Sequence, residues 1–207
     1  MKFDLKKIVN GPFDQNAYIL YNSKNFCVLV DPGLDYDIII NELNYINKKP
    51  SSILLTHAHI DHIGIVDKLQ NKFNLKVFMH EEDQEISKNL PTYCQMFGLE
   101  ILKPPKITNL ISDENSIEIA NYTFNIIKTP GHTPGGLSYM IGNIVFVGDT
   151  LFNNSIGRTD LPGGSFSVLV NSIKDKLFLL DDKVKVYSGH GPVTTIGYEK
   201  KNNIFLK

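Results

Sequence analysis

The segment Thr56-His57-Ala58-His59-Ile60-Asp61-His62 constrains this chain more than any other feature of its sequence. It places four side chains that commonly bind metals within six residues, although the chain has only six histidines among its 207 residues. His57 and His59 are two apart, so in extended backbone both project to the same side and can bind one cation. Asp61 and His62 lie where the next helix is predicted to begin and can face a second cation. The chain is therefore expected to place a strand end at this motif.

Three further loops carry side chains of the same kind, each after a predicted strand. His132 lies in a Pro/Gly-rich segment, Asp149 follows an apolar strand, and His190 follows the last predicted strand. Loops at strand ends are where active-site groups usually lie. Five imidazoles and two carboxylates, with no thiolate among them, indicate a site for Zn²⁺, Fe or Mn rather than a Cys-rich structural zinc site. Seven donors exceed one tetrahedral sphere, so we predict two divalent ions, zinc first with iron or manganese as alternatives, and Asp149 placed to bridge them.

Strand-like and helix-like segments alternate along the rest of the chain. Strands are predicted over residues 3–9, 17–21, 26–30, 53–55, 76–79, 117–119, 122–127, 137–141, 144–147 and 184–187. Helices are predicted over residues 36–46, 63–73, 81–89 (ended by Pro91) and about 168–177. Two strand-rich halves, up to about residue 79 and from residue 107, indicate two sheets packed face to face with helices outside. The candidate ligands lie on both sides of the predicted linker Pro104-Pro105, so we predict one domain over residues 1–207.

Composition excludes several classes of protein. The 42% hydrophobic content excludes bulk disorder, and 21 Lys+Arg against 22 Asp+Glu give no reason to expect nucleic acid or an anionic membrane as the main partner. The first residues lack the apolar run of a signal peptide, and no stretch approaches the roughly 18 apolar residues of a membrane span. We therefore expect a soluble cytoplasmic protein. Cys27 and Cys94 cannot make a disulfide framework, and His80 is expected to be structural.

With these motifs the sequence resembles the metallo-β-lactamase superfamily. The resemblance rests on the 57–62 motif, His132, Asp149, His190 and an early Asp31-Pro32-Gly33, in matching order over essentially the whole chain. It implies an α+β fold, a four-layer αββα sandwich of two packed mixed sheets.

The resemblance also implies roles for individual residues. The first ion would be held by His57, His59 and His132. The second would be held by Asp61, His62 and His190, with Asp149 bridging the two ions and Asp61 also serving as a catalytic carboxylate. Asp31 would orient the ligands through hydrogen bonds without binding metal, although a turn residue before Pro-Gly is an equally simple interpretation.

Within the superfamily, the segments 131–135 and 148–152 are most similar to the glyoxalase II group, hydroxyacylglutathione hydrolases that cleave thioesters such as S-lactoylglutathione. An Asp at position 149 argues against the true β-lactamases, which place a cysteine there. The loop 156–164 and the chain end, about 17 residues after His190, are similar to the short bacterial type, which lacks a helical glutathione-binding extension. In that loop Arg158 would bind a substrate carboxylate, unless it is a solvated loop residue.

The implied activity is hydrolysis of a small-molecule thioester by a hydroxide held at the metals, since a bound divalent ion brings the pKa of water from 15.7 to about 7. A thiolate, with a thiol pKa of about 8.5, leaves without a separate acid. One alternative is a mononuclear-iron persulfide dioxygenase, which the stretch 157–160 also resembles, with iron on His57, His132 and Asp149. The other is a lactonase-type metallo-hydrolase.

Overall fold

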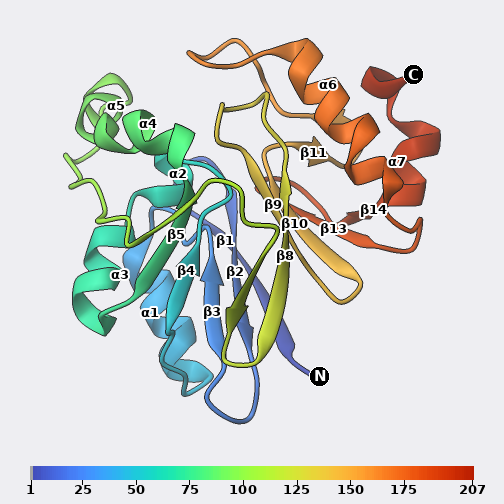
Figure 1. Cartoon of the computed structure of the whole chain (residues 1–207). Coiled ribbons are helices and arrows are strands. Elements are labelled where there is room, and N and C mark those ends of the chain that lie inside the picture. Colours follow the sequence, from blue (N-terminus) through green and yellow to red (C-terminus); the bar gives the residue numbers. More distant parts are fainter. Residues whose placement is uncertain (1) are drawn as a thin grey trace. The chain divides into compact units, whose positions relative to one another are not determined.

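The structure, a computed structural model, describes residues 2–207 and divides after Ile111 into two units (Figure 1). Each unit contains one six-stranded mixed sheet. The prediction that residues 1–207 form one domain stays a prediction, and the two units are described separately below.

The first sheet contains six strands that neighbour one another in chain order. Its strands are β1 (Asp4–Asn10), β2 (Gln15–Tyr21), β3 (Cys27–Val30), β4 (Ser52–Leu54), β5 (Lys76–His80) and β6 (Asn109–Ile111). β1, β2 and β3 pair antiparallel, whereas β3 to β6 pair parallel. Both loops that follow β3 and β4 therefore leave the sheet at the same edge, and these loops carry Asp31 and the 57–62 motif.

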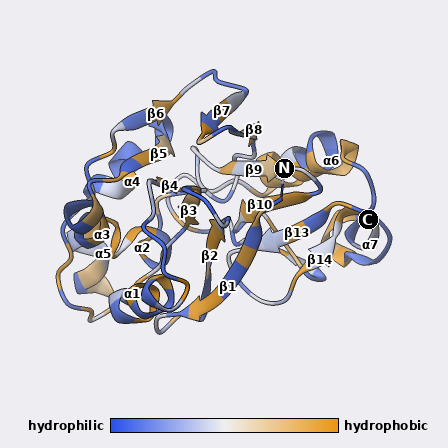
Figure 2. Ribbon diagram, turned by 90° about the horizontal axis from the view of Figure 1, so that it is seen from below, coloured by the Kyte–Doolittle hydropathy of each residue, from blue (hydrophilic) through white to orange (hydrophobic). Residues whose placement is uncertain are grey.

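The helices of the first unit pack on one face of this sheet. They are α1 (Tyr36–Tyr45), α2 (Ile60–Ile63), α3 (Val66–Phe73), the 3₁₀ helix η1 (Glu81–Asp83), α4 (Gln84–Lys88) and α5 (Leu90–Met96). Alternate strand residues such as Ile19, Leu29 and Ile53 form an apolar core with Leu43 of α1 and Leu69 of α3. Figure 2 shows the matching pattern on α1, which alternates between hydrophilic and hydrophobic turns.

The helix predicted over residues 63–73 is instead two helices, α2 and α3, separated at Gly64 and Ile65. The Ile65 N–H donates to the carbonyl of Gly33, and the Gly33 N–H donates to the carbonyl of His62. These bonds fasten the chain to the Asp31-Pro32-Gly33 turn. Helix α2 therefore starts at Ile60, inside the histidine motif, which the spacing of apolar residues did not reveal.

Pro91 begins a helix rather than ending one. The segment predicted as one helix over 81–89 is η1 followed by α4, and Pro91 lies in the first turn of α5. The first turn tolerates proline because its N–H has no intrahelical partner there. The helix predicted to end before Pro91 does end, at Lys88, but the prediction did not include the new helix that begins at Leu90.

The second sheet has the order β14-β13-β10-β9-β8-β7. Its strands are β7 (Ser116–Ile119), β8 (Tyr122–Lys128), β9 (Leu137–Ile141), β10 (Ile144–Gly148), β13 (Lys185–Ser188) and β14 (Thr194–Thr195). A separate hairpin, β11 (Leu151–Phe152) and β12 (Ser155–Ile156), follows β10. The helices of this unit are α6 (Phe166–Asp175), η2 (Leu177–Leu179), α7 (Ile196–Asn202) and η3 (Ile204–Leu206). Val145 and Val186 pack with Leu169, Ile173 and Ile196 in its core.

The division between the units lies later than the predicted linker Pro104-Pro105. After the two prolines, β6 pairs with β5 in the first sheet, and the second unit begins only at Ser112. A three-residue strand has too few residues for its alternation to be read from sequence.

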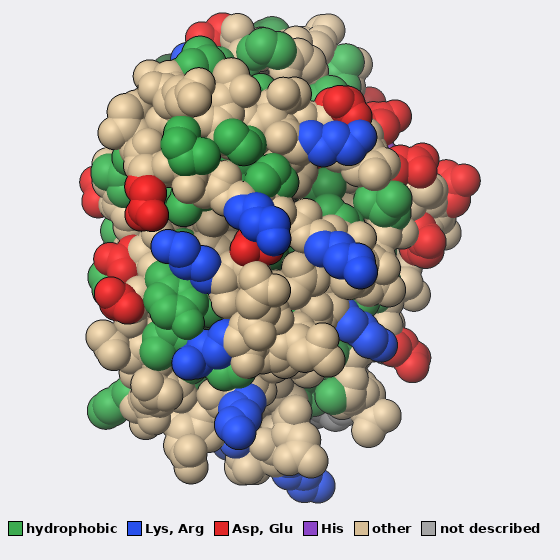
Figure 3. Space-filling model, turned by 90° about the vertical axis from the view of Figure 1, so that its left-hand side faces the viewer, with side chains coloured by type: hydrophobic (Ala, Val, Ile, Leu, Met, Phe, Trp, Pro, Cys, Tyr) green, Lys and Arg blue, Asp and Glu red, His purple; other side chains and the backbone are tan. Residues whose placement is uncertain are grey.

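Among residues 2–207, no helix combines the length and the apolar character needed to cross a membrane. The face drawn in Figure 3 carries Lys and Arg side chains spread among neutral and apolar surface, with most Asp and Glu toward its edges and one beside a central basic side chain.

Candidate metal centre

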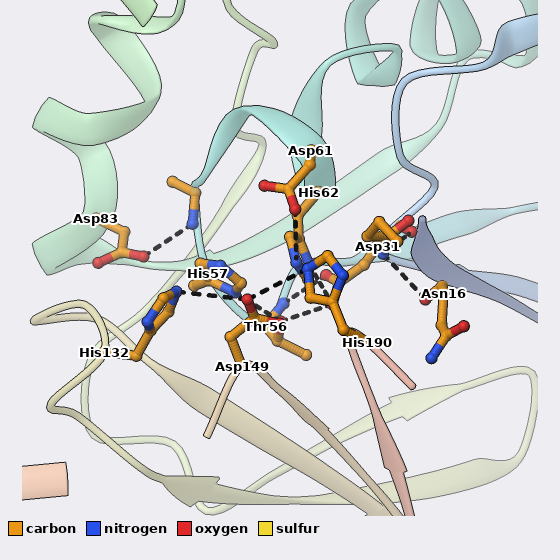
Figure 4. Close-up of polar contacts among 12 residues, drawn as sticks. Asn16, Asp31, Thr56, His57, Asp61, His62, Asp83, His132, Asp149 and His190 are labelled. Atoms are coloured by element: carbon orange, nitrogen blue, oxygen red, sulfur yellow. Dashed lines mark hydrogen bonds and ion pairs between the residues drawn. The ribbon is translucent and has the colours of Figure 1, made fainter. Parts of the chain in front are cut away.

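The first ligand cluster, which we define as His57, His59, Asp61 and His62, spans the loop after β4 and the start of α2 (Figure 4). The ring of His57 lies 4.8 Å from the ring of His59 and 4.0 Å from that of His62, measured between centroids. His57 and His62 are 2% and 0% exposed. The structure thus brings His57 and His59 together, as their spacing predicts, and also places the His62 ring against His57.

Asp31 anchors this cluster from the loop after β3. One carboxylate oxygen accepts the Thr56 N–H at 2.8 Å. The other accepts the Thr56 hydroxyl at 2.6 Å and lies 3.0 Å from Nδ1 of His62. Asp31 itself has a φ of +46°, a left-handed conformation that Asp and Asn tolerate better than most residues. The geometry agrees with an orienting role rather than with a simple turn residue.

These contacts assign the tautomers of two histidines. The Asp31 carboxylate 3.0 Å away favours the tautomer with the proton on Nδ1 of His62, although the contact does not have the geometry of a hydrogen bond. The Thr56 hydroxyl donates its hydrogen bond to Asp31, so its oxygen accepts from Nδ1 of His57, 3.1 Å away. In both rings Nε2 is then the atom with the lone pair that a metal requires.

Asp83 is a residue of this region that the sequence analysis missed. Its side chain is fully buried and accepts the N–H of Ala58 at 2.9 Å, which holds the loop between His57 and His59 in place. In the sequence it follows Glu81 and Glu82, both exposed in the structure, and nothing in the pattern separates it from them. His80 is structural as predicted, because its Nδ1 accepts the Glu82 N–H at the start of η1.

The second ligand cluster, defined as His132, Asp149 and His190, comes from three loops of the second unit (Figure 4). Nε2 of His132 lies 3.7 Å and Nε2 of His190 lies 3.5 Å from the same oxygen of Asp149. β10 and β13 are parallel neighbours, and the Gly189 N–H donates to the Gly148 carbonyl across their ends. The sheet therefore brings Asp149 beside His190.

The His132 ring is fixed by the main chain. Its Nδ1 lies 2.7 Å from the carbonyl oxygen of Arg158, which can only accept, so Nδ1 carries the proton and Nε2 the lone pair. The loop reaches this position because residue 157 is glycine. A Cβ on Gly157 would lie 1.8 Å from the Asp149 carbonyl oxygen, so no side chain fits there.

The side chain of Arg158 does not point to a partner in the cluster. Its guanidinium forms two hydrogen bonds with Asp160, at 2.8 and 2.7 Å, and both side chains are mostly exposed. The hydrogen bond from Arg158 is the main reason that the pKa of Asp160 falls from 3.8 to about 2. Binding of a substrate carboxylate by Arg158 remains a prediction, and such a carboxylate would share the guanidinium with Asp160.

The donor chemistry of both clusters fits borderline divalent ions. The seven predicted ligands are imidazoles and carboxylates, and three of the imidazoles have their Nδ1 atoms engaged as described above. The two thiols lie elsewhere, since Cys27 and Cys94 are both buried in the apolar core of the first unit. Burial raises the pKa of the Cys27 thiol to about 12, so it stays protonated near neutral pH.

Comparison with known proteins points in one direction. The sequence profile of the metallo-β-lactamase superfamily matches residues 10–190. Hydroxyacylglutathione hydrolase GloC of Haemophilus influenzae is 33% identical over 203 residues, covering 94% of this chain and 93% of that protein. A probable metallo-hydrolase, YqgX of Bacillus subtilis, is 36% identical over 200 residues, covering 95% of this chain and 94% of that protein.

Two solved structures resemble the whole chain. BLEG-1, described as a B3 metallo-β-lactamase, has a TM-score of 0.93 and 40% identity, covering 99% of this chain and 100% of its own. TTHA1623, described in a di-iron-bound form, has a TM-score of 0.86 and 33% identity, covering 97% of this chain and 100% of its own. These similarities confirm the predicted α+β fold class.

Proposed function

Because the chain belongs to the metallo-β-lactamase superfamily of metallo-hydrolases, we propose that it hydrolyses thioesters of the hydroxyacylglutathione type. The observation that carries this proposal is the 33% identity to GloC over nearly the full length of both proteins. The complete set of imidazole and carboxylate ligands supports it, since a non-catalytic relative would be expected to lack one. S-lactoylglutathione is the first substrate to test.

In this proposal the protein uses two divalent ions. We assign the first to His57, His59 and His132, and the second to Asp61, His62 and His190, with Asp149 shared between them. The oxygen of Asp149 that lies near both His132 and His190 supports the shared assignment. Zinc fits the donor atoms, and because TTHA1623 is described in a di-iron-bound form, we propose iron as an equal candidate for the two ions.

Bound divalent ions would supply a low pKa for water and polarisation of the substrate carbonyl. The chain's own contribution is preorganisation. Asp31, Thr56 and the Arg158 carbonyl fix the rings of His62, His57 and His132 before substrate arrives, so little reorganisation accompanies the reaction. Asp61, with a side chain 15% exposed, is the carboxylate proposed to accept and return a proton. The thiolate product needs no acid, because thiols have pKa values of about 8.5.

The test combines metal content with four assays. We expect about two metal ions per chain and hydrolysis of S-lactoylglutathione that is lost after chelation and restored by Zn²⁺, Fe²⁺ or Mn²⁺. One iron per chain with oxygen uptake on glutathione persulfide would instead establish a dioxygenase. A chromogenic cephalosporin is included because BLEG-1 is described as a β-lactamase, and its faster turnover would overturn the thioesterase proposal. A simple lactone serves as the fourth substrate, for the lactonase alternative.

A further inference from the structure

A second recess lies in the second unit, at the open edge of its sheet. It is a pocket of about 480 Å³ whose polar lining residues include Asn153, Lys185, Tyr187, Thr195 and Tyr198. None of these residues belongs to the predicted metal ligands. No acidic side chain lines the pocket.

The sheet register explains why these side chains meet. Lys185 and Tyr187 are two apart on β13, so both project to one face while Val186 packs into the core on the other. Lys185 pairs with Thr195 of β14, the last strand of the sheet. The ring of Tyr187 also packs on that of Phe146, with 5.6 Å between centroids.

A buried carboxylate holds the walls of the pocket together. Glu199 of α7 is fully buried and accepts hydrogen bonds from the Thr194 hydroxyl, the Asn154 N–H and the Asn203 side chain. These bonds tie the β11–β12 turn and the edge strand to α7. Asn154 also donates to the hydroxyl of Tyr198 at 3.3 Å. The pocket is therefore built by a fixed hydrogen-bond network and is more than a gap between loops.

Lys185 gives the pocket its charge. Three other cations of this unit are paired: Lys128 with Asp113, Arg158 with Asp160 and Lys200 with Asp182. Within residues 2–207, no carboxylate lies within ion-pair distance of Lys185. One ammonium group beside tyrosine and threonine hydroxyls matches a single carboxylate, whereas a diphosphate calls for more positive charge.

One wall of the pocket continues into a segment that lies near the second ligand cluster. Asn153 follows Phe152, whose ring lies 6.1 Å from the ring of His190. Lys185 lies roughly 10 Å further along β13 from Ser188, because a strand rises about 3.3 Å per residue. An extended peptide gains about 3.5 Å per residue, so the terminal carboxylate of a short peptidyl thiol lies within about 10 Å of its sulfur.

We propose that this pocket recognises the terminal carboxylate of a peptidyl thiol carrier, with Lys185 as the charged partner and the hydroxyls of Tyr187 and Tyr198 as further donors. The inference rests on the proposed thioesterase function. The acyl group of the substrate would react at the metal ligands while its thiol carrier extends toward Lys185. Burial raises the pKa of Tyr187, so its hydroxyl stays protonated and able to donate.

The test compares two thioesters of one acyl group. S-lactoylglutathione has a terminal carboxylate, and S-lactoyl-N-acetylcysteamine has none. In Lys185→Gln we expect the ratio of kcat/KM for the first to that for the second to fall about tenfold, the size of one charge-assisted hydrogen bond. Tyr187→Phe is expected to lower the ratio about threefold. Lys183→Gln, an exposed lysine in the turn before β13, is the matched control and is expected to leave the ratio unchanged.

Each other outcome counts against a definite claim. An unchanged ratio in Lys185→Gln, or an equal fall of the ratio in Lys183→Gln, overturns the proposal that the pocket recognises the carboxylate. Preference for an acetoacetyl-coenzyme A thioester overturns the choice of carboxylate over phosphate. If the wild type hydrolyses neither lactoyl thioester, the proposed function fails. Calorimetric titration with S-methylglutathione then tests separately whether the pocket binds the carboxylate. A Kd about tenfold weaker in Lys185→Gln supports it, and an equal Kd or an absence of binding overturns it.

Discussion

The two ligand clusters are built in opposite ways. The first comes from six consecutive residues, and two of its members, His57 and His62, are 2% and 0% exposed. The second gathers three residues from separate loops, and the His190 side chain is 30% exposed. Their supports differ too: a side-chain carboxylate, Asp31, orients the first, whereas a main-chain carbonyl, that of Arg158, orients a ring of the second. A cluster held by a side chain is sensitive to the identity of that residue, and one held by a carbonyl is sensitive to backbone path.

The largest effect should follow loss of the shared carboxylate. Asp149→Ala removes the oxygen near both His132 and His190, so we expect metal content to fall below one ion per chain and thioesterase activity to fall by about 10³-fold or more, equivalent to about 4 kcal/mol. Elemental analysis and steady-state kinetics measure both. Asp175→Ala, on an exposed position of α6, is the control. Wild-type turnover in Asp149→Ala would refute the assignment.

The backbone dependence of the second cluster is tested at Gly157. In Gly157→Ala the new Cβ would overlap the Asp149 carbonyl, so the loop must move and carry the Arg158 carbonyl away from His132. We expect activity to fall about 100-fold, in the range found when a group that orients a metal ligand is lost. Arg158→Ala keeps the carbonyl and should retain its metal. If both variants lose metal equally, the distinction between side-chain and main-chain support is wrong.

The first cluster should respond instead to the identity of residue 31. In Asp31→Asn the amide places N–H groups where the carboxylate oxygens accept from Thr56, one of them also lying 3.0 Å from Nδ1 of His62, so one donor must face another. We expect metal affinity to fall about 10- to 100-fold, measured by competition with a chelator. Thr56→Val, which removes the hydroxyl that links Asp31 to His57 but leaves Asp31 beside His62, should cost less, and Asp37→Asn at an exposed site should cost nothing. Equal losses in all three would contradict the proposed chain of hydrogen bonds.

The smallest effect concerns the exposed pair beside the second cluster. The pKa of Asp160 is about 2 in the folded chain, against an ordinary 3.8. A lowered pKa means that the pair stabilises the fold above pH 3.8 and loses that contribution as the pH falls through about 2. Between about pH 5 and 9 the pair therefore does not titrate. Asp160→Asn should change the KM for S-lactoylglutathione about two- to threefold, equally across that range, because exposed ion pairs contribute little. A KM effect that varies with pH there would contradict this.

Sequence patterns predicted the longer elements well and the short ones poorly. The helix starting at Tyr36 and the strand Leu137–Ile141 lie where their apolar spacing predicts them. β6, β11, β12 and β14, of two or three residues, contain too few positions for a period to show. α2 and α3 were joined in the prediction because the interruption depends on hydrogen bonds of His62 and Ile65 with Gly33, 29 and 32 residues earlier in the chain.

The sequence by itself determined which side chains can bind metal, because ligand chemistry and local spacing are properties of the residues themselves. It also indicated Asp31 as an orienting group through its resemblance to a family motif. Only the tertiary structure decided which ring nitrogen of each fixed histidine carries the proton. That choice depends on groups from distant segments. Asp31 lies beside Nδ1 of His62 and accepts the hydroxyl proton of Thr56, so that Thr56 accepts from its neighbour His57, and the Arg158 carbonyl accepts from His132. A main-chain carbonyl is present at every residue, so no sequence pattern can reveal the one that folding brings to His132.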